Sequence, residues 1–481
     1  MQYFSTRGQS PAVNSADAVL MGLAPDGGLY LPQQIPDFDW RGCLTLEPIA
    51  MAERILTAFL PDIPEMPELV RRAYAGKFET EELTPTVRVG DFTVLELFRG
   101  PTSAFKDVAL SMLPQLMTAA AKAKGVKEDI LILTATSGDT GKAALEGFRD
   151  VDGIRICVFY PDGGVSLVQR RQMVSQEGGN VTVCAVRGNF DDCQTGVKNV
   201  FAACGDKELS FRLSSANSIN IGRLVPQITY YFKAYRDLLD RGRISPGDPV
   251  NFSVPTGNFG DILAGYLAKR LGLPVGRLIC ASNANNVLTD FIRTGTYDRR
   301  RPLYKTQSPS MDILVSSNME RLLYLLSGDS ALVADLMGRL NREGCYTVPQ
   351  PLLAQIQEHF WAGCCDDARA ADAINRVWCH YGYLCDPHTA AGWVAAEDYV
   401  NQTGDRRPMV VLSTASAYKF PAAVLEAIGC RAEGDEFAQM ERLCEKTGVP
   451  IPKNLAGLRQ LPQRHLGVID REEMLTFVLN L

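Results

Sequence analysis

Short apolar segments that alternate with helical stretches constrain the fold of this chain more than any other feature. The segments are residues 130–134, 155–159, 181–185, 250–254, 278–281 and 409–412. Each is mostly apolar and has the length of a strand buried on both faces. Strands of this kind separated by helices indicate βαβ units and parallel sheets. The sequence therefore predicts an α/β fold.

The chain is too long for one ordinary domain. At 481 residues it should divide into two or three folding units. Prolines punctuate the first 85 residues, which predicts short helices joined by turns. Residues 319–400 are predicted to be helical, and a charged helical tail is expected over residues 431–481.

Composition narrows the class of protein and its partners. A hydrophobic content of 46% and a charged content of 22% are typical of a soluble globular protein. The net charge of -6 argues against nucleic acid and against an anionic membrane as the main partner. No secretory signal or membrane span is expected. The thirteen cysteines lie scattered without a CxxC pair, which favours reduced thiols and a cytoplasmic location.

One lysine occupies an unusual local position. A Gly100-Pro101 turn leads through Phe105 to Lys106, and an apolar helical run follows directly. A desolvated ammonium group is costly, so lysine usually avoids such a position. A lysine held there loses its proton easily and can act as a nucleophile or form an imine. A solvated lysine at a helix start remains the alternative.

Three loops follow predicted strands, where open α/β sheets bind their ligands. The loop after residues 130–134 places hydroxyl groups and two glycines before a helix. Its backbone N–H groups suit a carboxylate, although a simple N-cap by Asp139 or Thr140 explains the pattern equally well. The P-loop spacing GxxxxGK[ST] is absent. An aspartic-protease role for Asp139-Thr140-Gly141 is improbable, because those proteases are β-rich and need two such carboxylates.

The other two loops follow residues 250–254 and 409–412. In the first, Gly257 and Gly260 let the backbone approach a ligand at a helix start, which favours a phosphate over an ordinary glycine-rich turn. In the second, Thr414 offers a hydroxyl for a heterocyclic ring nitrogen, with strand-end capping as the alternative. A lysine, a phosphate cradle, a carboxylate loop and such a hydroxyl are together what pyridoxal phosphate needs.

The chain resembles the threonine synthase family, in its longer type, over nearly its whole length. The shared motifs occur in the same order and are Ser5–Gly8, Gly22–Tyr30, Gly100–Thr102, Phe105–Asp107, Ala135–Gly141, Ser215–Asn220, Gly257–Asp261, Ser308–Ile313 and Asp386–Ala390. The resemblance implies fold type II of the pyridoxal-phosphate enzymes. It also implies an N-terminal domain (1–90), a large cofactor domain (91–125 and 224–430), a smaller inserted α/β domain (126–223) and a C-terminal tail (431–481).

The same resemblance implies a role for each matching residue. Lys106 is expected to carry the Schiff base with pyridoxal 5'-phosphate, and Thr414 to face its ring nitrogen. The expected phosphate cradle is Gly257, Asn258, Phe259, Gly260 and Asp261. The expected loop for the substrate's carboxylate is Thr136, Ser137, Gly138, Asp139 and Thr140. The expected substrate-side segment is Asn217, Ser218, Asn220 and Arg223, with Arg223 the candidate for the substrate's phosphate because a guanidinium matches that geometry.

The implied reaction is the last step of threonine biosynthesis, which converts O-phospho-L-homoserine and water to L-threonine and phosphate. A related phospho-lyase that releases 2-oxobutyrate and ammonia, a serine or threonine deaminase, and a non-catalytic protein with the same fold are the alternatives. Retention of Lys106 argues against the last. The protein is expected to be a monomer or homodimer.

Two further features of the sequence concern a possible metal site and the charge near Lys106. His380, Cys385 and His388 lack the paired spacing of a metal site, so no metal is expected. Arg99 stands where many relatives carry histidine, a departure that leaves Lys106 untouched but is expected to change the charge of the pocket.

Overall fold

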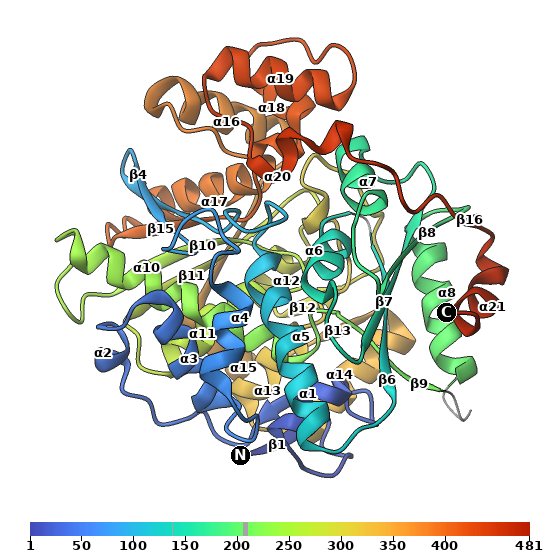
Figure 1. Cartoon of the computed structure of the whole chain (residues 1–481). Helices are drawn as coiled ribbons and strands as arrows, with labels where there is room; N and C mark the ends of the chain where they lie inside the picture. The colour runs from blue at the N-terminus through green and yellow to red at the C-terminus, as the bar shows by residue number, and fades with distance from the viewer. Residues whose placement is uncertain (137, 205–209) are drawn as a thin grey trace.

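Two largely parallel sheets organise the protein (Figure 1). The computed structural model describes residues 1–136, 138–204 and 210–481. The larger sheet contains, in spatial order, β14 (Phe360–Cys364), β11 (Val275–Ser282), β10 (Val250–Pro255), β15 (Met409–Ser413), β5 (Phe92–Glu96) and β4 (Thr86–Val89). Strand β4 is antiparallel to β5, and the other neighbours are parallel.

The smaller sheet is parallel throughout. It contains, in spatial order, β16 (Val468–Ile469), β8 (Val181–Val186), β7 (Ile154–Pro161), β6 (Asp129–Ala135) and β9 (Phe211–Ser214). Two antiparallel sheets lie outside these. They are β2 (Val13–Asn14), β1 (Gln2–Ser5) and β3 (Tyr30–Pro32) near the N-terminus, and the pair β12 (Thr296–Asp298) and β13 (Cys345–Thr347).

Helices cover both large sheets. Those before residue 241 are α1 (Ser15–Met21), α2 (Trp40–Cys43), α3 (Pro48–Phe59), α4 (Met66–Tyr74), α5 (Lys106–Ala123), α6 (Asp139–Phe148), α7 (Leu167–Val174), α8 (Phe190–Cys204), α9 (Ile221–Leu224) and α10 (Ile228–Asp240). Helix α5 lies between α1 and α4 on one side and α6 on the other, so it joins the N-terminal segment to the smaller sheet.

The remaining helices belong mostly to the larger sheet and the tail. They are α11 (Gly260–Arg270), α12 (Val287–Thr294), α13 (Met319–Ser327), α14 (Ser330–Glu343), α15 (Gln350–His359), α16 (Asp367–Tyr381), α17 (Pro387–Thr403), α18 (Pro421–Ala427), α19 (Glu436–Thr447), α20 (Lys453–Ala456) and α21 (Met474–Leu479). Short 3₁₀ turns are η1 (Val225–Gln227), η2 (Pro309–Met311), η3 (Ala417–Lys419), η4 (Leu458–Gln460) and η5 (Arg471–Glu473).

Burial explains why the central strands read as apolar runs. Every residue of β10 is buried, because helix α17 contacts this strand and the neighbouring β11, while α11 also packs on β11. A strand covered on both faces cannot alternate apolar and polar residues. The α/β prediction is confirmed, and the predicted strands appear as β6, β7, β8, β10, β11 and β15.

Two sequence expectations are wrong in part. The stretch 319–400 is not uniformly helical, since β13 and β14 interrupt it. Both strands are short and lie between helices, so neither shows a strand period of its own. The tail after residue 431 is helical as predicted in α19, α20 and α21, but it also contains β16. This strand pairs with β8, and α21 packs on α8, so the tail ends on the smaller sheet.

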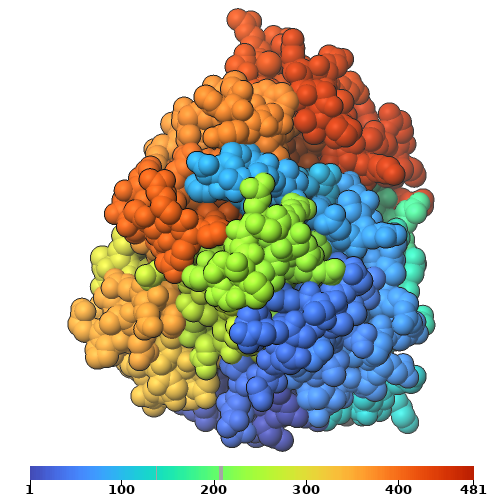
Figure 2. All heavy atoms as spheres, turned by 90° about the vertical axis from the view of Figure 1, so that its left-hand side faces the viewer, coloured from blue at the N-terminus to red at the C-terminus, as the bar shows by residue number. Residues whose placement is uncertain are grey.

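Two further observations concern the surface. No helix among the described residues has the length and apolarity needed to cross a bilayer. A cavity of about 1130 Å³ opens between the β4–β5 hairpin and helices α16 and α17, on the face shown in Figure 2. Its lining includes Arg88, Phe92 and Trp393 but none of the predicted site residues. The predicted site lies elsewhere, where the two large sheets meet.

Candidate active site

A tight turn places the predicted Schiff-base lysine. The Asp107 carboxylate accepts hydrogen bonds from the Thr102 amide at 2.8 Å and the Thr102 hydroxyl at 2.5 Å. A Cβ on Gly100 would lie 2.5 Å from Asp107 Cβ, so only glycine fits there. Ser103 has a left-handed φ of 58° within the same turn. These contacts explain the Gly-Pro-Thr motif and Asp107, and they begin helix α5 at Lys106.

The Lys106 amine is buried among polar groups. Its Nζ atom lies 3.2 Å from Ser310 Oγ and 4.0 Å from Asp139 Oδ2. Burial lowers the pKa of Lys106 to about 8; Asp139 opposes this shift, and the positive charges of Lys419 and Arg223 add to it. On the order of one molecule in ten then carries the neutral amine at pH 7. The neutral amine is the nucleophilic form, so this position suits imine chemistry.

The segment after β15 lies directly against the lysine segment. The Phe105 amide donates to the Thr414 carbonyl at 2.9 Å, and the Ser416 amide donates to the Ser103 carbonyl at 3.2 Å. Thr414 itself is buried. Because β5, β15 and β10 are parallel neighbours, their carboxyl ends lie at one edge of the sheet. The structure therefore brings Thr414 next to the segment that carries Lys106, while the role of its hydroxyl toward a ring nitrogen stays a prediction.

The loop between β10 and α11 has the form of an anion cradle. A Cβ on Gly257 would lie 2.5 Å from the Ser310 carbonyl oxygen, so the backbone approaches its neighbour too closely for any other residue. Phe259 has a left-handed φ of 61°, an uncommon conformation that turns successive amides toward one point. Helix α11 begins at Gly260 and adds the positive end of its dipole. Asn258 is held through its carbonyl, which accepts from the Asn318 amide at 3.1 Å.

Asp261 turns away from this loop toward helix α10. Its Oδ1 atom accepts hydrogen bonds from Tyr230 and Tyr231 hydroxyls, while Oδ2 is buried without a partner among the described residues. Burial raises the pKa of Asp261 to about 7, although the two tyrosine hydrogen bonds and Lys106 oppose the shift. Asp261 therefore supports the cradle from behind, next to its amides.

Asp261→Asn is expected to change how stability depends on pH. The raised pKa means that the folded state holds a proton that the unfolded state releases between about pH 4 and pH 7, so stability falls as pH rises through this range. Asparagine removes that proton uptake, and the slope should flatten by up to about 1.4 kcal/mol per pH unit. Urea denaturation at several pH values measures this slope. Asp240→Asn, at an exposed acid of α10, is the control, and an unchanged slope in Asp261→Asn contradicts the assignment.

The loop after β6 holds its shape through one hydroxyl. Thr136 Oγ1 accepts from the Gly138 amide at 3.0 Å and from the Gly141 amide at 2.8 Å. The amides of Asp139 and Thr140 lie in the first turn of α6, where no carbonyl of the helix can accept from them. Such amides suit a carboxylate ligand. Ser137, predicted for the same loop, lies outside the described residues.

The segment from Asn217 to Arg223 is divided between surface and interior. Asn217 is exposed, and the Ser218 hydroxyl lies 3.4 Å from the Ser317 hydroxyl. The Asn220 side chain caps α9 and donates to the Val19 carbonyl at 2.8 Å, so it holds the N-terminal segment in place. A direct contact between Asn220 and a substrate stays a prediction.

Arg223 is buried, and its positive charge helps to lower the pKa of Lys106. The guanidinium donates from Nη1 to the Ala216 carbonyl, while Nε has no partner among the described residues. Burial lowers the pKa of Arg223 to about 10, still well above neutral pH. A buried cation with a free donor is costly unless an anion binds it.

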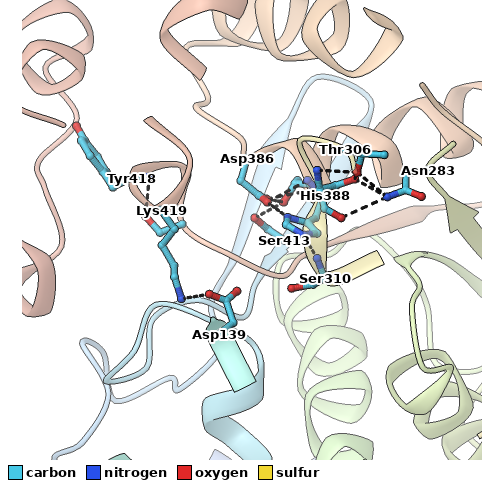
Figure 3. Close-up of polar contacts among 12 residues, drawn as sticks. Asp139, Asn283, Thr306, Ser310, Asp386, His388, Ser413, Tyr418 and Lys419 are labelled. Carbon is cyan, nitrogen blue, oxygen red and sulfur yellow. Dashed lines mark hydrogen bonds and ion pairs between the residues drawn. The ribbon is translucent and has the colours of Figure 1, made fainter. Parts of the chain in front are cut away.

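Sequence reasoning missed a chain of hydrogen bonds from Asp386 through His388 to Ser310 (Figure 3). The Ser310 amide donates to His388 Nε2 at 3.1 Å, so the proton lies on Nδ1, which contacts Asp386 Oδ2 at 2.6 Å. Asp386 also caps helix α17. Asn283 and Thr306, which are drawn in the same view, are hydrogen-bonded at 2.8 Å. The hydrogen bond from His388 fixes the backbone of Ser310, whose hydroxyl contacts the Lys106 amine. The sequence signal was the Asp386-Pro387-His388 motif, which the sequence identified as a family motif and a helix start but to which it gave no role beside Ser310.

A second lysine was also missed. Lys419 is fully buried and lies 2.5 Å from Asp139 Oδ1, as Figure 3 shows. Its amine also donates to the Thr102 carbonyl at 3.2 Å. Burial would raise the pKa of Asp139, but Lys419 and Lys106 hold it well below its usual range. The signal in the sequence was its place five residues after Thr414, at the end of the same loop.

The charge of Arg99 is compensated locally. Its guanidinium lies 2.7 Å from Glu96 Oε2 and 3.1 Å from Glu79 Oε2. Glu96 is buried and also accepts from the Tyr383 hydroxyl at 3.1 Å. Two carboxylates for one guanidinium leave no excess positive charge at this point.

Three family models match successive parts of the chain. "Threonine synthase N terminus" matches residues 2–74, "Pyridoxal-phosphate dependent enzyme" matches residues 79–339, and "Threonine synthase, C-terminal" matches residues 389–478. Among curated relatives, the Threonine synthase of Pseudomonas aeruginosa is 42% identical over 89% of this chain and 90% of its own length. Human Threonine synthase-like 1 is 39% identical over 86% of this chain, which spans only 58% of that relative.

Solved structures agree with the sequence comparisons. A PLP-bound Threonine synthase from Brucella melitensis superposes with a TM-score of 0.88 at 41% identity, over 100% of this chain and 98% of the other. The Threonine Synthase from yeast superposes with a TM-score of 0.89 at 33% identity, over 100% and 98% of the two chains. The fold is fold type II of the pyridoxal-phosphate enzymes. The chain belongs to the threonine synthase family of pyridoxal-phosphate-dependent enzymes.

Proposed function

We propose that this protein converts O-phospho-L-homoserine and water to L-threonine and phosphate. The observation that carries the proposal is the convergence of strand-end loops on one buried, partly neutral lysine. Around Lys106 lie an anion cradle at Gly257–Gly260, the first turn of α6 and the buried cation of Arg223. The cradle would hold the cofactor's phosphate, the first turn of α6 the substrate's carboxylate, and Arg223 the substrate's phosphate.

The residues present fit pyridoxal phosphate. Lys106 would hold it through its amine, the backbone from Gly257 to Gly260 would hold its phosphate, and the Thr414 hydroxyl would face its ring nitrogen. When bound, the cofactor supplies an electron sink for charge that develops on the substrate's carbon atoms. A neutral hydroxyl at Thr414, unlike a carboxylate, would not hold a proton on that nitrogen.

The chain's own groups account for proton transfer and orientation. The Lys106 amine, once released, takes a proton from the α carbon of the substrate and later returns one. Ser310, fixed by His388, holds this amine in place through its hydroxyl. A second proton leaves the β carbon, phosphate then leaves the γ carbon, and a proton adds to the γ carbon. Water adds its hydroxyl to the β carbon, and return of a proton to the α carbon gives threonine.

Substrate recognition divides between two anion sites. The first turn of α6, with Thr136, Ser137, Gly138, Asp139 and Thr140, would hold the carboxylate. Arg223 would hold the phosphate, with Asn217, Ser218 and Asn220 along the same side. The support is the buried guanidinium, whose Nε has no partner among the described residues.

An end-point assay tests the reaction. The purified protein is incubated with O-phospho-L-homoserine, and the products are identified. Threonine and phosphate in equal amounts are the expected result. Release of 2-oxobutyrate and ammonia shows the related phospho-lyase instead, and no phosphate release contradicts both. Turnover of unphosphorylated serine or threonine alone indicates a deaminase.

Arg223→Met is expected to raise the KM for O-phospho-L-homoserine at least about tenfold, because a charged hydrogen bond to phosphate is lost. Arg223→Lys should recover part of this affinity, since it keeps the charge without the bidentate geometry. Steady-state kinetics give both values. Arg241→Met, at an exposed arginine that donates to the Thr86 carbonyl, is the control. A KM unchanged in Arg223→Met removes this residue from the phosphate site.

We also propose a cytoplasmic location and a monomer or homodimer. The thirteen cysteines are free thiols, which suits a reducing compartment. Sedimentation of the purified protein distinguishes the two assembly states.

A further inference from the structure

We propose that Lys419 is the counter-ion that allows the loop at the start of α6 to bind the substrate's carboxylate. The inference rests on the proposed function, because that function supplies the carboxylate. Lys419 is a positioning residue, because it acts through its contact with Asp139.

The loop poses an electrostatic problem that Lys419 solves. Asp139 is the first residue of α6, and the free amides beside it are the groups suited to a carboxylate. A second carboxylate in the same place would be repelled by an uncompensated Asp139, most strongly in a buried site with a low dielectric constant. Asp139 is 5% exposed, so water does not screen it.

The contacts of Asp139 show which cation compensates it. Its Oδ1 atom lies 2.5 Å from Lys419 Nζ and accepts from Gln169 Nε2 at 2.9 Å. Lys106 Nζ lies farther away, 4.0 Å from Oδ2, and its amine is needed for chemistry. Gln169 is neutral. The cation in direct contact with Asp139 is therefore Lys419.

The same pair joins the two halves of the site. Lys419 follows β15 of the larger sheet, whereas Asp139 follows β6 of the smaller sheet. The Lys419 amine also donates to the Thr102 carbonyl, in the turn that leads to Lys106. One buried amine thus holds the lysine turn and the start of α6 at a fixed separation, as the Lys419–Asp139 contact in Figure 3 illustrates.

A pair of matched ligands tests this role in the cofactor-loaded protein. L-threonine and 1-aminopropan-2-ol carry the same amine and hydroxyl groups, but only threonine has a carboxylate. The visible absorbance is titrated with each, and the ratio of the two dissociation constants reports the carboxylate alone. The proteins compared are wild type, Lys419→Met, Lys419→Arg, Asp139→Asn and the double variant Asp139→Asn/Lys419→Met.

Lys419→Met should weaken threonine binding at least tenfold and leave 1-aminopropan-2-ol within about threefold. Lys419→Arg and the double variant should recover most of the threonine affinity, because both leave Asp139 compensated or absent. Asp139→Asn should not weaken threonine binding, and this variant keeps the test decisive if Lys419→Met fails to fold.

The following results would overturn the inference. Equal weakening of both ligands in Lys419→Met, or threonine weakened in Asp139→Asn as much as in Lys419→Met, assigns the pair a structural role only. Wild type that responds to neither ligand contradicts the proposed function as well. Wild type that discriminates the two, together with an unchanged ratio in Lys419→Met, contradicts only the role of Lys419.

Discussion

Lys106→Ala is expected to abolish threonine formation, with a loss of at least about 1000-fold in kcat/KM, and to remove the visible absorbance of the lysine-bound cofactor. General acid–base catalysis alone contributes about 100- to 10,000-fold, and Lys106 also provides the covalent link. The second effect follows because alanine cannot form an imine. An end-point assay of the products measures the first effect, and an absorbance spectrum of the purified variant measures the second.

The control for Lys106→Ala is a helical lysine outside the predicted site. Lys269 lies near the far end of α11 and donates to the Gly276 carbonyl at 2.9 Å. Lys269→Ala should keep both the absorbance band and the activity. Added methylamine should restore part of the activity of Lys106→Ala, since a free amine can enter the cavity left by the side chain. A visible band that survives in Lys106→Ala shows that a different lysine binds the cofactor.

The sequence predicts the central strands well for a physical reason. Strands such as β6 and β10 are buried on both faces, so their apolar runs stand out against the helices around them. Strand β14, at the edge of the larger sheet, contains Gly363 and lies directly between α15 and α16 in the sequence. Its identity depends on pairing with β11, a contact about 80 residues away in sequence that local patterns do not carry.

The candidate site divides in the same way. Backbone features can be recognised in the sequence. Gly100 and Gly257 are glycines because neighbouring atoms lie too close for a Cβ, and Lys106 stands out because it begins an apolar helix. Side-chain partnerships leave none. The contact of Lys419 with Asp139 spans the two sheets, and His388 reaches Ser310 from a different helix. Asn220 is an example of a sequence motif that predicts ligand binding although, in the structure, the side chain caps helix α9.

Gly257→Ala is expected to lower the affinity for pyridoxal phosphate by about 10- to 100-fold. The added Cβ would lie 2.5 Å from the Ser310 carbonyl oxygen, a backbone atom that cannot rotate away. Overpacking of this kind costs about 1–3 kcal/mol. The added methyl group should push the Gly257 loop and the Ser310 segment apart. The Ser316 hydroxyl, which donates to the Gly257 carbonyl at 2.7 Å, links the same two segments, so both should move.

Titration of the cofactor-free protein with pyridoxal phosphate gives the dissociation constant of the Gly257→Ala variant. Gly457→Ala is the matched control, because no atom lies within 4 Å of its added Cβ and its φ of -97° suits any residue. That variant should bind the cofactor as wild type does. Since Lys106 is unchanged in both, a weakened Gly257→Ala that still forms the visible band separates the phosphate cradle from the covalent link. Wild-type affinity in Gly257→Ala would place the cofactor's phosphate at another loop, because this backbone cannot accept the methyl group without moving.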